Sequence, residues 1–329
     1  MLTRRQLVYL AYAGVGAVAL RSVLARAQMP TQRTAVDFDV PPNSCDCHVH
    51  VFDPAIQPYA ERRIYTPPTA TTEELLDLQK ALRLDRVVIV QPSIYRDNNK
   101  LTIEATKRLG ARARAVAVIG PSTTRTEIDE MHAAGVRGVR LNLETNVAGK
   151  FDADGAKALL DKTAKQLDGR GWHVQFYTRL DTIAALKDTF SQQPFPLVFD
   201  HFGRATAQGG VEQPHFDVLL DLVKNGHAYV KISGAYRCST KGPDFLDVKP
   251  LAEALVKANP DRLVWGSDWP HPDSAAGRNK PLTEIAEPFP IDDGLVFNQV
   301  ARWVPDAATR KKILVDNAAK LYDFSPQAS

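Results

Sequence analysis

The chain has few cysteines and little excess of charge. Only three cysteines occur among 329 residues, and Cys45 and Cys47 form a C-x-C pair without the spacing of a zinc ribbon, so a disulfide framework is not indicated. The formal net charge is +3 and no block of lysine and arginine appears. Electrostatic capture of a nucleic acid is therefore not expected.

The N-terminal part lacks an apolar run of the roughly 20 residues that a membrane-spanning helix needs. It contains instead a twin-arginine pattern around Arg4-Arg5, an alanine-rich apolar run from Tyr9 to Leu20, and a cleavage-like Ala25-Arg26-Ala27. We expect residues 1–28 to be a signal segment read by the twin-arginine export machinery. The expected location is the bacterial periplasm, with no stable membrane anchor.

The rest of the chain alternates short apolar segments with helical patterns. After a polar lead-in at 29–43, strands are predicted near 45–53, 86–91, 114–119, 138–143, 172–177, 197–201, 228–233 and 262–268. Strand–helix alternation indicates a parallel sheet. An open, doubly wound sheet would have a glycine-rich phosphate turn after its first strand, and none is present there. We predict an α/β fold, a (β/α)8 TIM barrel over residues 44–329.

Two histidines lie side by side on the first predicted strand. Strict alternation places His48 and His50 on one face with Asp46, and Cys47 and Val49 on the other. Two such imidazoles can polarise a carbonyl, bind a divalent metal, or simply form hydrogen bonds in a core. The residues of this strand leave all three interpretations open.

Polar side chains recur at the carboxyl ends of the predicted strands, where the chemistry of such barrels lies. They are His48, His50, Ser93, Arg140, Asn142, Tyr177, His201, Arg204, Arg237 and Asp268. Burying so many unpaired polar groups for stability alone would be costly. This convergence favours a functional site.

Four motifs in order carry a resemblance to the amidohydrolase superfamily, in its family 2 branch. They are Asp46-Cys47-His48-Val49-His50, Asp200-His201-Phe202-Gly203-Arg204, Trp265-Gly266-Ser267-Asp268-Trp269-Pro270-His271 and Asp316-Asn317-Ala318-Ala319-Lys320-Leu321-Tyr322. Within that branch the chain most resembles the 2-pyrone-4,6-dicarboxylate lactonases and related sugar-lactone hydrolases and isomerases. The resemblance implies a barrel of the metal-dependent-hydrolase type.

The resemblance also implies a division of labour in opening a lactone or cyclic ester that carries a carboxylate. The imidazoles of His48, His50 and His201 would polarise the carbonyl, and Asp268 would activate water. The substrate's polar groups would be held by Tyr65, Ser93, Arg140, Tyr177, Arg204 and Arg237. In this family's pattern a second arginine follows shortly after Arg140; Asn146 stands in its place, so the pyrone dicarboxylate itself is not the expected substrate.

Metal ligation is the open alternative. His48, His50, His201 and Asp268 would hold one zinc or similar divalent ion, but the fifth strand ends in Gln175-Phe176-Tyr177 and offers no histidine ligand. No cofactor is therefore favoured. The alternatives are a mononuclear zinc-dependent hydrolase or decarboxylase, a lactone isomerase, and an exported binding protein that keeps the barrel for ligand capture.

Overall fold

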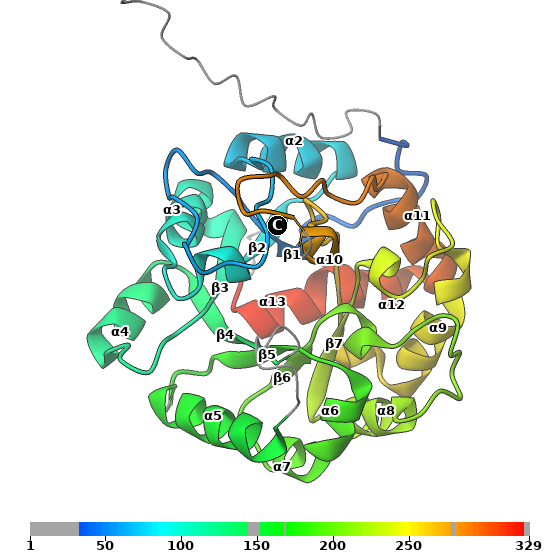
Figure 1. The fold of residues 1–329 in the computed structure, drawn as a ribbon. Helices are drawn as coiled ribbons and strands as arrows, with labels where there is room; N and C mark the ends of the chain where they lie inside the picture. Colours follow the sequence, from blue (N-terminus) through cyan, green and yellow to red (C-terminus); the bar gives the residue numbers. More distant parts are fainter. Residues whose placement is uncertain (1–32, 144–151, 168, 278–279, 326–329) are drawn as a thin grey trace, which may run out of the picture.

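The computed structural model describes residues 33–143, 152–167, 169–277 and 280–325, so the twin-arginine pattern and Asn146 lie outside the described residues. Within them the strands form one parallel sheet in chain order (Figure 1). The strands are β1 Cys45–Val49, β2 Arg86–Val90, β3 Ala113–Ala117, β4 Val136–Asn142, β5 His173–Tyr177, β6 Leu197–Phe199, β7 Ala228–Ser233 and β8 Leu263–Gly266.

The sheet closes on itself between β1 and the end of β8. The His50 N–H donates to the Trp269 carbonyl at 2.8 Å, and the Asp268 N–H donates to the His48 carbonyl at 2.9 Å. Closure removes the exposed edges that an open sheet would present. The predicted (β/α)8 barrel is confirmed.

Helices surround the barrel (Figure 1). They are α2 Thr72–Leu82, α3 Lys100–Leu109, α4 Arg125–Ala133, α5 Ala153–Gln166, α6 Leu180–Ala185, α7 Lys187–Ser191, α8 Phe216–Lys224, α9 Lys249–Ala258, α10 Ser274–Gly277, α11 Asp293–Trp303, α12 Ala307–Lys311 and α13 Asn317–Tyr322. Among these described helices, none combines the length and apolarity needed to cross a bilayer.

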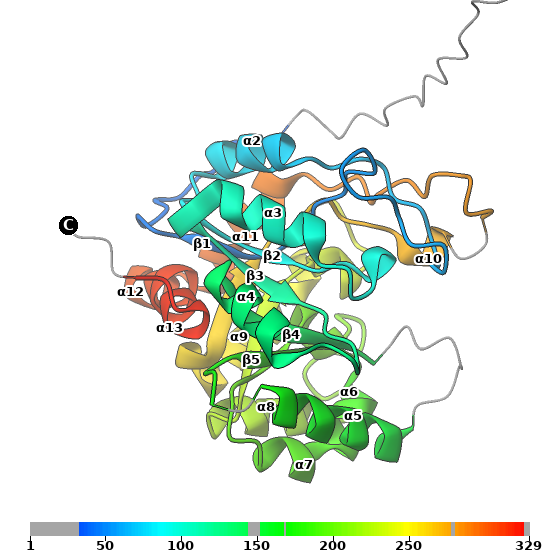
Figure 2. The same ribbon diagram turned by 90° about the vertical axis from the view of Figure 1, so that its left-hand side faces the viewer.

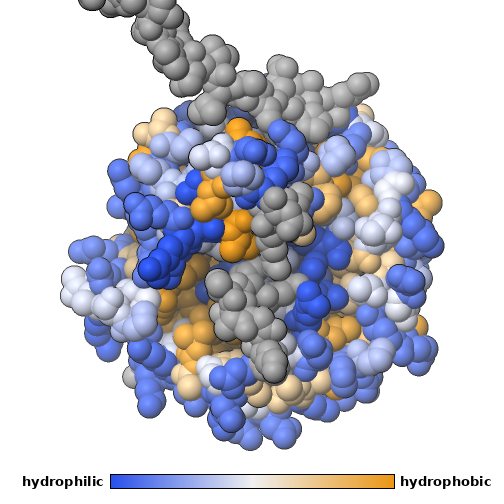
Figure 3. All heavy atoms as spheres, viewed as in Figure 1, coloured by the Kyte–Doolittle hydropathy of each residue, from blue (hydrophilic) through white to orange (hydrophobic). Residues whose placement is uncertain are grey.

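The two ends of the barrel differ. Figure 2 shows α12 and α13 at one end, and the loop that carries α10 at the other. Leu321 and Tyr322 of α13 belong to one buried apolar cluster with Cys45 and Val88 of the barrel interior, so apolar side chains close this end. On the face seen in Figure 3, hydrophilic residues predominate along the outer edge of the molecule. The loops at the carboxyl ends of the strands therefore frame the accessible end.

A bulge in β1 breaks the alternation expected from the sequence. Cys45 and Asp46 pair with Arg86 and Val87, but Val49 pairs with Ile89, so β1 has one residue more than β2 over this stretch. Cys47 consequently packs inside the barrel with Val88 and Val90. His48 also turns inward, above the cysteines, where it contacts Lys231 of β7. The expectation that Cys47 faces away from His48 was wrong.

The bulge brings the β1 backbone close to Gly266 on β8. A Cβ atom at Gly266 would lie 2.8 Å from the backbone nitrogen of His48, closer than real Cβ contacts allow. Asp46 braces the same stretch because its carboxylate accepts hydrogen bonds from the backbone N–H groups of His48 (3.1 Å) and Ser267 (2.9 Å). The position of both histidines therefore depends on how β1 meets β8.

Candidate active site

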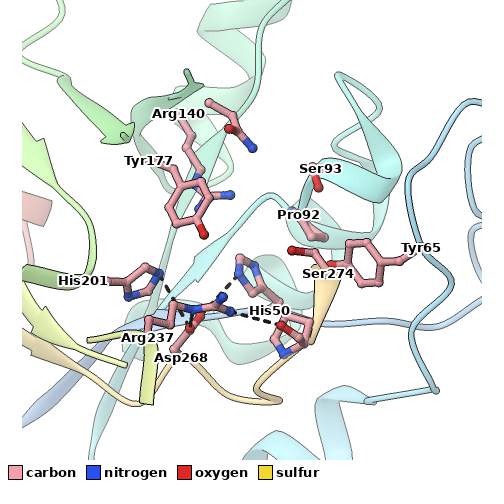
Figure 4. Close-up of a pocket in the computed structure, with 12 residues that line it drawn as sticks. His50, Tyr65, Pro92, Ser93, Arg140, Tyr177, His201, Arg237, Asp268 and Ser274 are labelled. Carbon is pink, nitrogen blue, oxygen red and sulfur yellow. Dashed lines mark hydrogen bonds and ion pairs between the residues drawn. The ribbon is translucent and has the colours of Figure 1, made fainter. Parts of the chain in front are cut away.

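A pocket opens at the carboxyl end of the barrel (Figure 4). Most of the side chains proposed from the sequence line it: His50, Tyr65, Ser93, Arg140, Tyr177, His201, Arg237 and Asp268. His48 lies beneath it, fully buried. Arg204 lies beside it, in a second cavity that shares Arg237 as a lining residue. The strand ends thus bring residues far apart in the sequence to one place.

Asp268 is the centre of the cluster. Its Oδ2 atom accepts hydrogen bonds from the Tyr236 hydroxyl at 2.7 Å and from Nε of Arg237. Its Oδ1 atom is buried, has no hydrogen-bond partner, and lies 3.7 Å from Nε2 of His48 and 3.8 Å from Nε2 of His50. One carboxylate oxygen is therefore anchored while the other faces the imidazoles.

The charge on Asp268 is strongly stabilised. Burial alone would raise the pKa of this carboxyl, but the Arg237 guanidinium, and then the imidazoles of His201 and His48, outweigh burial and hold the pKa well below its usual value. The backbone of Asp268 is in the left-handed region, with φ of +65°. A non-glycine residue in this region costs on the order of 1 kcal/mol, which is typical of functional sites.

The histidines are uncharged at neutral pH. Burial, followed by the charge of Lys231, lowers the pKa of His48 to about 3. Burial lowers the pKa of His50 to about 4. Burial also holds the pKa of His201 well below its usual value. Each imidazole therefore has one nitrogen with a hydrogen and one with a lone pair, and its partners decide which is which.

The partner of His50 fixes its tautomer. Nδ1 of His50 lies 2.7 Å from the Val90 carbonyl oxygen, which can only accept. The hydrogen is consequently on Nδ1, and the lone pair of Nε2 faces the pocket. Nδ1 of His201 lies 2.9 Å from the Ser233 hydroxyl, which can donate or accept, so this contact leaves the tautomer of His201 open.

Beneath the pocket lies a polar layer that the sequence did not single out as functional. Asp200 accepts hydrogen bonds at Oδ2 from Nε of Arg140 (3.2 Å) and from the Gln175 amide (3.1 Å). Nζ of Lys231 lies 3.6 Å from Asp200 Oδ1. Burial would raise the pKa of Asp200, but His48, Lys231 and Arg140 outweigh it and hold that pKa well below its usual value.

Three further residues of the site were not predicted from the sequence: Tyr236, Lys231 and Ser274. Tyr236 precedes Arg237 in a short 3-10 turn whose geometry the sequence does not reveal. Lys231 interrupts the apolar β7 between Val230 and Ile232, which is the one clear sequence signal among them. Ser274 follows β8 by several residues in the loop over the pocket.

A metal fits this donor set only in part. Two groups bring their ligand atoms within 4.8 Å of one another in the described residues, His48 with His50 and Asp268, and His48 with Asp200 and His201. His50 directs a lone pair at the pocket, as a ligand must. However, Arg237 is bound to Asp268, and the Lys231 ammonium lies 3.3 Å from Nδ1 of His48. The positive charges of Arg237 and Lys231 beside the potential ligands disfavour binding of a metal cation there.

Comparison with known proteins agrees with this barrel and its strand-end site. The family model described as amidohydrolase matches residues 45–324, and the chain belongs to that family. A 4-sulfomuconolactone hydrolase of Rhizobium radiobacter is 37% identical over 301 residues, covering 90% of this chain and 95% of the relative. A 2-pyrone-4,6-dicarboxylate hydrolase of Comamonas testosteroni is 33% identical over 295 residues, covering 87% and 92%.

The fold has a solved counterpart. A crystal structure of a protein from Agrobacterium tumefaciens, determined without ligand, aligns with a TM-score of 0.72 and 26% identity. The alignment covers 87% of this chain and 97% of that one. The resemblance to the amidohydrolase superfamily inferred from the four motifs is therefore confirmed over nearly the whole barrel.

Asp200→Asn should destabilise the fold, because it leaves the buried Lys231 ammonium without its counter-ion. We expect a loss of about 3–5 kcal/mol in the free energy of unfolding, measured by urea titration at neutral pH. The pKa of Asp200 is lower in the folded state than in the unfolded chain. Its stabilising effect is therefore present above the unfolded pKa of about 3.9 and disappears as the pH falls toward the folded value.

Asp221→Asn is the matched control for this variant, since Asp221 pairs with Lys187 on the surface, where both side chains are about half exposed. It should leave stability almost unchanged. Equal destabilisation of the two variants would contradict the importance assigned to the buried pair.

Proposed function

We propose that the protein hydrolyses a lactone or cyclic ester that carries an anionic group. The observation that supports this most directly is the free Oδ1 atom of Asp268, which faces the imidazoles of His48 and His50 in a pocket that Arg140 and Arg237 also line. Such a group combines a base, polar contacts for a carbonyl, and cations for a substrate anion. The names of the two relatives add support, since both denote lactone-opening enzymes.

The proton transfers assign a role to each oxygen of Asp268. Oδ1 takes a proton from water as the water oxygen attacks the lactone carbonyl carbon. The carbonyl oxygen then carries the negative charge, which an imidazole N–H stabilises. When the bond to the ring oxygen breaks, Oδ1 returns the proton to that oxygen. Oδ2 stays bound to Tyr236 and Arg237 throughout, so the carboxylate does not rotate during the reaction.

His50 has a different part from the one implied by family resemblance. Because its Nδ1–H donates to Val90, its neutral ring cannot donate a hydrogen bond to the carbonyl oxygen. Its Nε2 lone pair can accept one from water instead. We assign His50 to orienting the attacking water beside Asp268, 3.8 Å away, and leave carbonyl polarisation to His48 and His201.

Arg237 links substrate charge to the strength of the base. This guanidinium is bound to Asp268 in the free protein and also lines the pocket. A substrate carboxylate or sulfonate that binds Arg237 shares its charge, weakens its hold on Asp268, and raises the pKa of that carboxyl toward neutrality. Anionic substrates should consequently react faster once bound, besides binding more tightly.

Asp268→Asn should sharply lower turnover and retain binding of an anionic lactone. The substrate is identified with a panel of carboxylated and sulfonated lactones, each paired with the neutral lactone of the same ring. NMR analysis of the products then distinguishes ring opening from isomerisation. The variant should lose about 10²–10⁴-fold in kcat, the usual effect of a general base. Asp221→Asn is the surface control. The proposal fails if the wild type hydrolyses no lactone, or if the asparagine variant stays within tenfold of it.

We propose that the reaction needs no metal, with one zinc ion as the alternative. Support comes from Arg237 and Lys231, whose positive charges lie against two of the would-be ligands. Protein purified without added metal should contain well under one equivalent of zinc by mass spectrometry, and chelator should leave kcat unchanged. One tightly held equivalent, with activity lost on its removal and restored by zinc, would establish the alternative.

We propose that residues 1–28 direct the folded protein to the periplasm. The support is the sequence pattern alone, Arg4-Arg5 before an alanine-rich apolar run and Ala25-Arg26-Ala27. In a bacterial host the full chain should appear, shortened, in the periplasmic fraction. Replacing Arg4 and Arg5 together by lysine should retain it in the cytoplasm at full length. Equal periplasmic amounts of both forms would contradict export by the twin-arginine route.

A further inference from the structure

Lys231 is the one buried cation of the site that no step above uses. Its side chain is completely buried inside the barrel, below the pocket and out of reach of a substrate there. A lysine ammonium has three hydrogens and can only donate. Any group that forms a hydrogen bond with Nζ of Lys231 must therefore be the acceptor of that bond.

Three acceptors account for the three hydrogens of Lys231. Nζ lies 2.8 Å from the Cys47 carbonyl oxygen, 2.7 Å from Oε1 of Gln175 and 3.3 Å from Nδ1 of His48. The Gln175 amide is correctly oriented for this, since its NH2 group donates to Asp200, an obligate acceptor. The contacts with Cys47 and Gln175 hold the ammonium in place, and its third hydrogen is directed at Nδ1 of the His48 imidazole.

A competing arrangement would have Nδ1 of His48 donate to Asp200. The distance to Oδ1 is short enough, at 3.2 Å. Oδ1 of Asp200, however, accepts no well-formed hydrogen bond, and the Lys231 ammonium lies 3.6 Å from this oxygen. Because the ammonium can only donate, its contact with Nδ1 requires a lone pair on that ring nitrogen.

We propose that Lys231 is a positioning residue that holds His48 in the tautomer with its hydrogen on Nε2. That hydrogen faces the pocket side of the ring, where Asp268 Oδ1 lies 3.7 Å away, and it is the donor that the carbonyl oxygen of a lactone needs. His50 has the opposite tautomer. The two histidines of the His-x-His pair are therefore not equivalent: His48 donates and His50 accepts.

This assignment rests on the proposed function only for its catalytic consequence. An oxyanion gains most from a donor that is already oriented, and loss of one such donor lowers kcat by about 10²–10³-fold in other hydrolases. Lys231 never meets the substrate, so its loss should lower kcat and leave KM nearly unchanged. The tautomer itself is a property of the free protein.

Two-bond ¹H–¹⁵N correlation spectra of ¹⁵N-histidine-labelled protein at neutral pH test the proposal without substrate. Signals are assigned with His48→Gln and His50→Gln. In the wild type, His48 should have its hydrogen on Nε2 and His50 on Nδ1. A hydrogen on Nδ1 of His48 would overturn the proposal. This wild-type spectrum is decisive even if a variant fails to fold, and it holds whether or not any lactone is hydrolysed.

Lys231→Met tests whether the lysine is the cause. It keeps the length of the side chain and removes all three donors, so His48 should change to the Nδ1 tautomer and donate to Asp200, with kcat about a hundredfold lower on whichever lactone the wild type hydrolyses. Lys249→Met, at a half-exposed lysine of α9, is the control and should change neither. A folded Lys231→Met protein with an unchanged His48 tautomer, or with wild-type kcat, would contradict the role of Lys231.

Discussion

The buried pair of Lys231 and Asp200 is the constraint on which the rest of the site depends. Both side chains are removed from water, and a single charge in such a place would cost several kcal/mol. Each charge is therefore surrounded: the carboxylate by Arg140 and Gln175, the ammonium by Gln175, His48 and a backbone carbonyl. Two of these partners adjoin the pocket: Arg140 lines it, and His48 lies directly beneath it. The charge balance of the interior thus orients groups that would bind and polarise a substrate.

Asp268 shows the same principle in one side chain. Its two oxygens have different surroundings, since Tyr236 and Arg237 bind one and only imidazoles lie near the other. A carboxylate held at one oxygen keeps the other in a fixed place without rotating.

Much of the fold and part of the site could be predicted from the sequence. Alternating strands and helices determine a parallel barrel, and the carboxyl-end rule correctly grouped His50, Arg140 and Asp268, because strand ends in a closed barrel must converge. The bulge at Cys47 and His48 could not be predicted, since it depends on contact with Gly266 across the closure. Tautomers were equally out of reach. A tautomer depends on which single atom lies beside each ring nitrogen, such as the Val90 carbonyl beside His50. Every residue has a backbone carbonyl, and only the folded structure determines which one contacts the imidazole.

The bulge also explains how one strand serves two layers of the barrel. Below it, β1 contributes small thiols to an apolar interior shared with valines of the neighbouring strands; above it, the same strand contributes imidazoles. With uninterrupted pairing, Cys45, Cys47 and Val49 would follow one another on the inner face, and His48 and His50 would point into the surrounding helices. The pocket would then receive no imidazole from β1. One extra residue in the pairing of β1 with β2 therefore turns the two histidines toward the pocket, without any change in the amino-acid sequence of the strand.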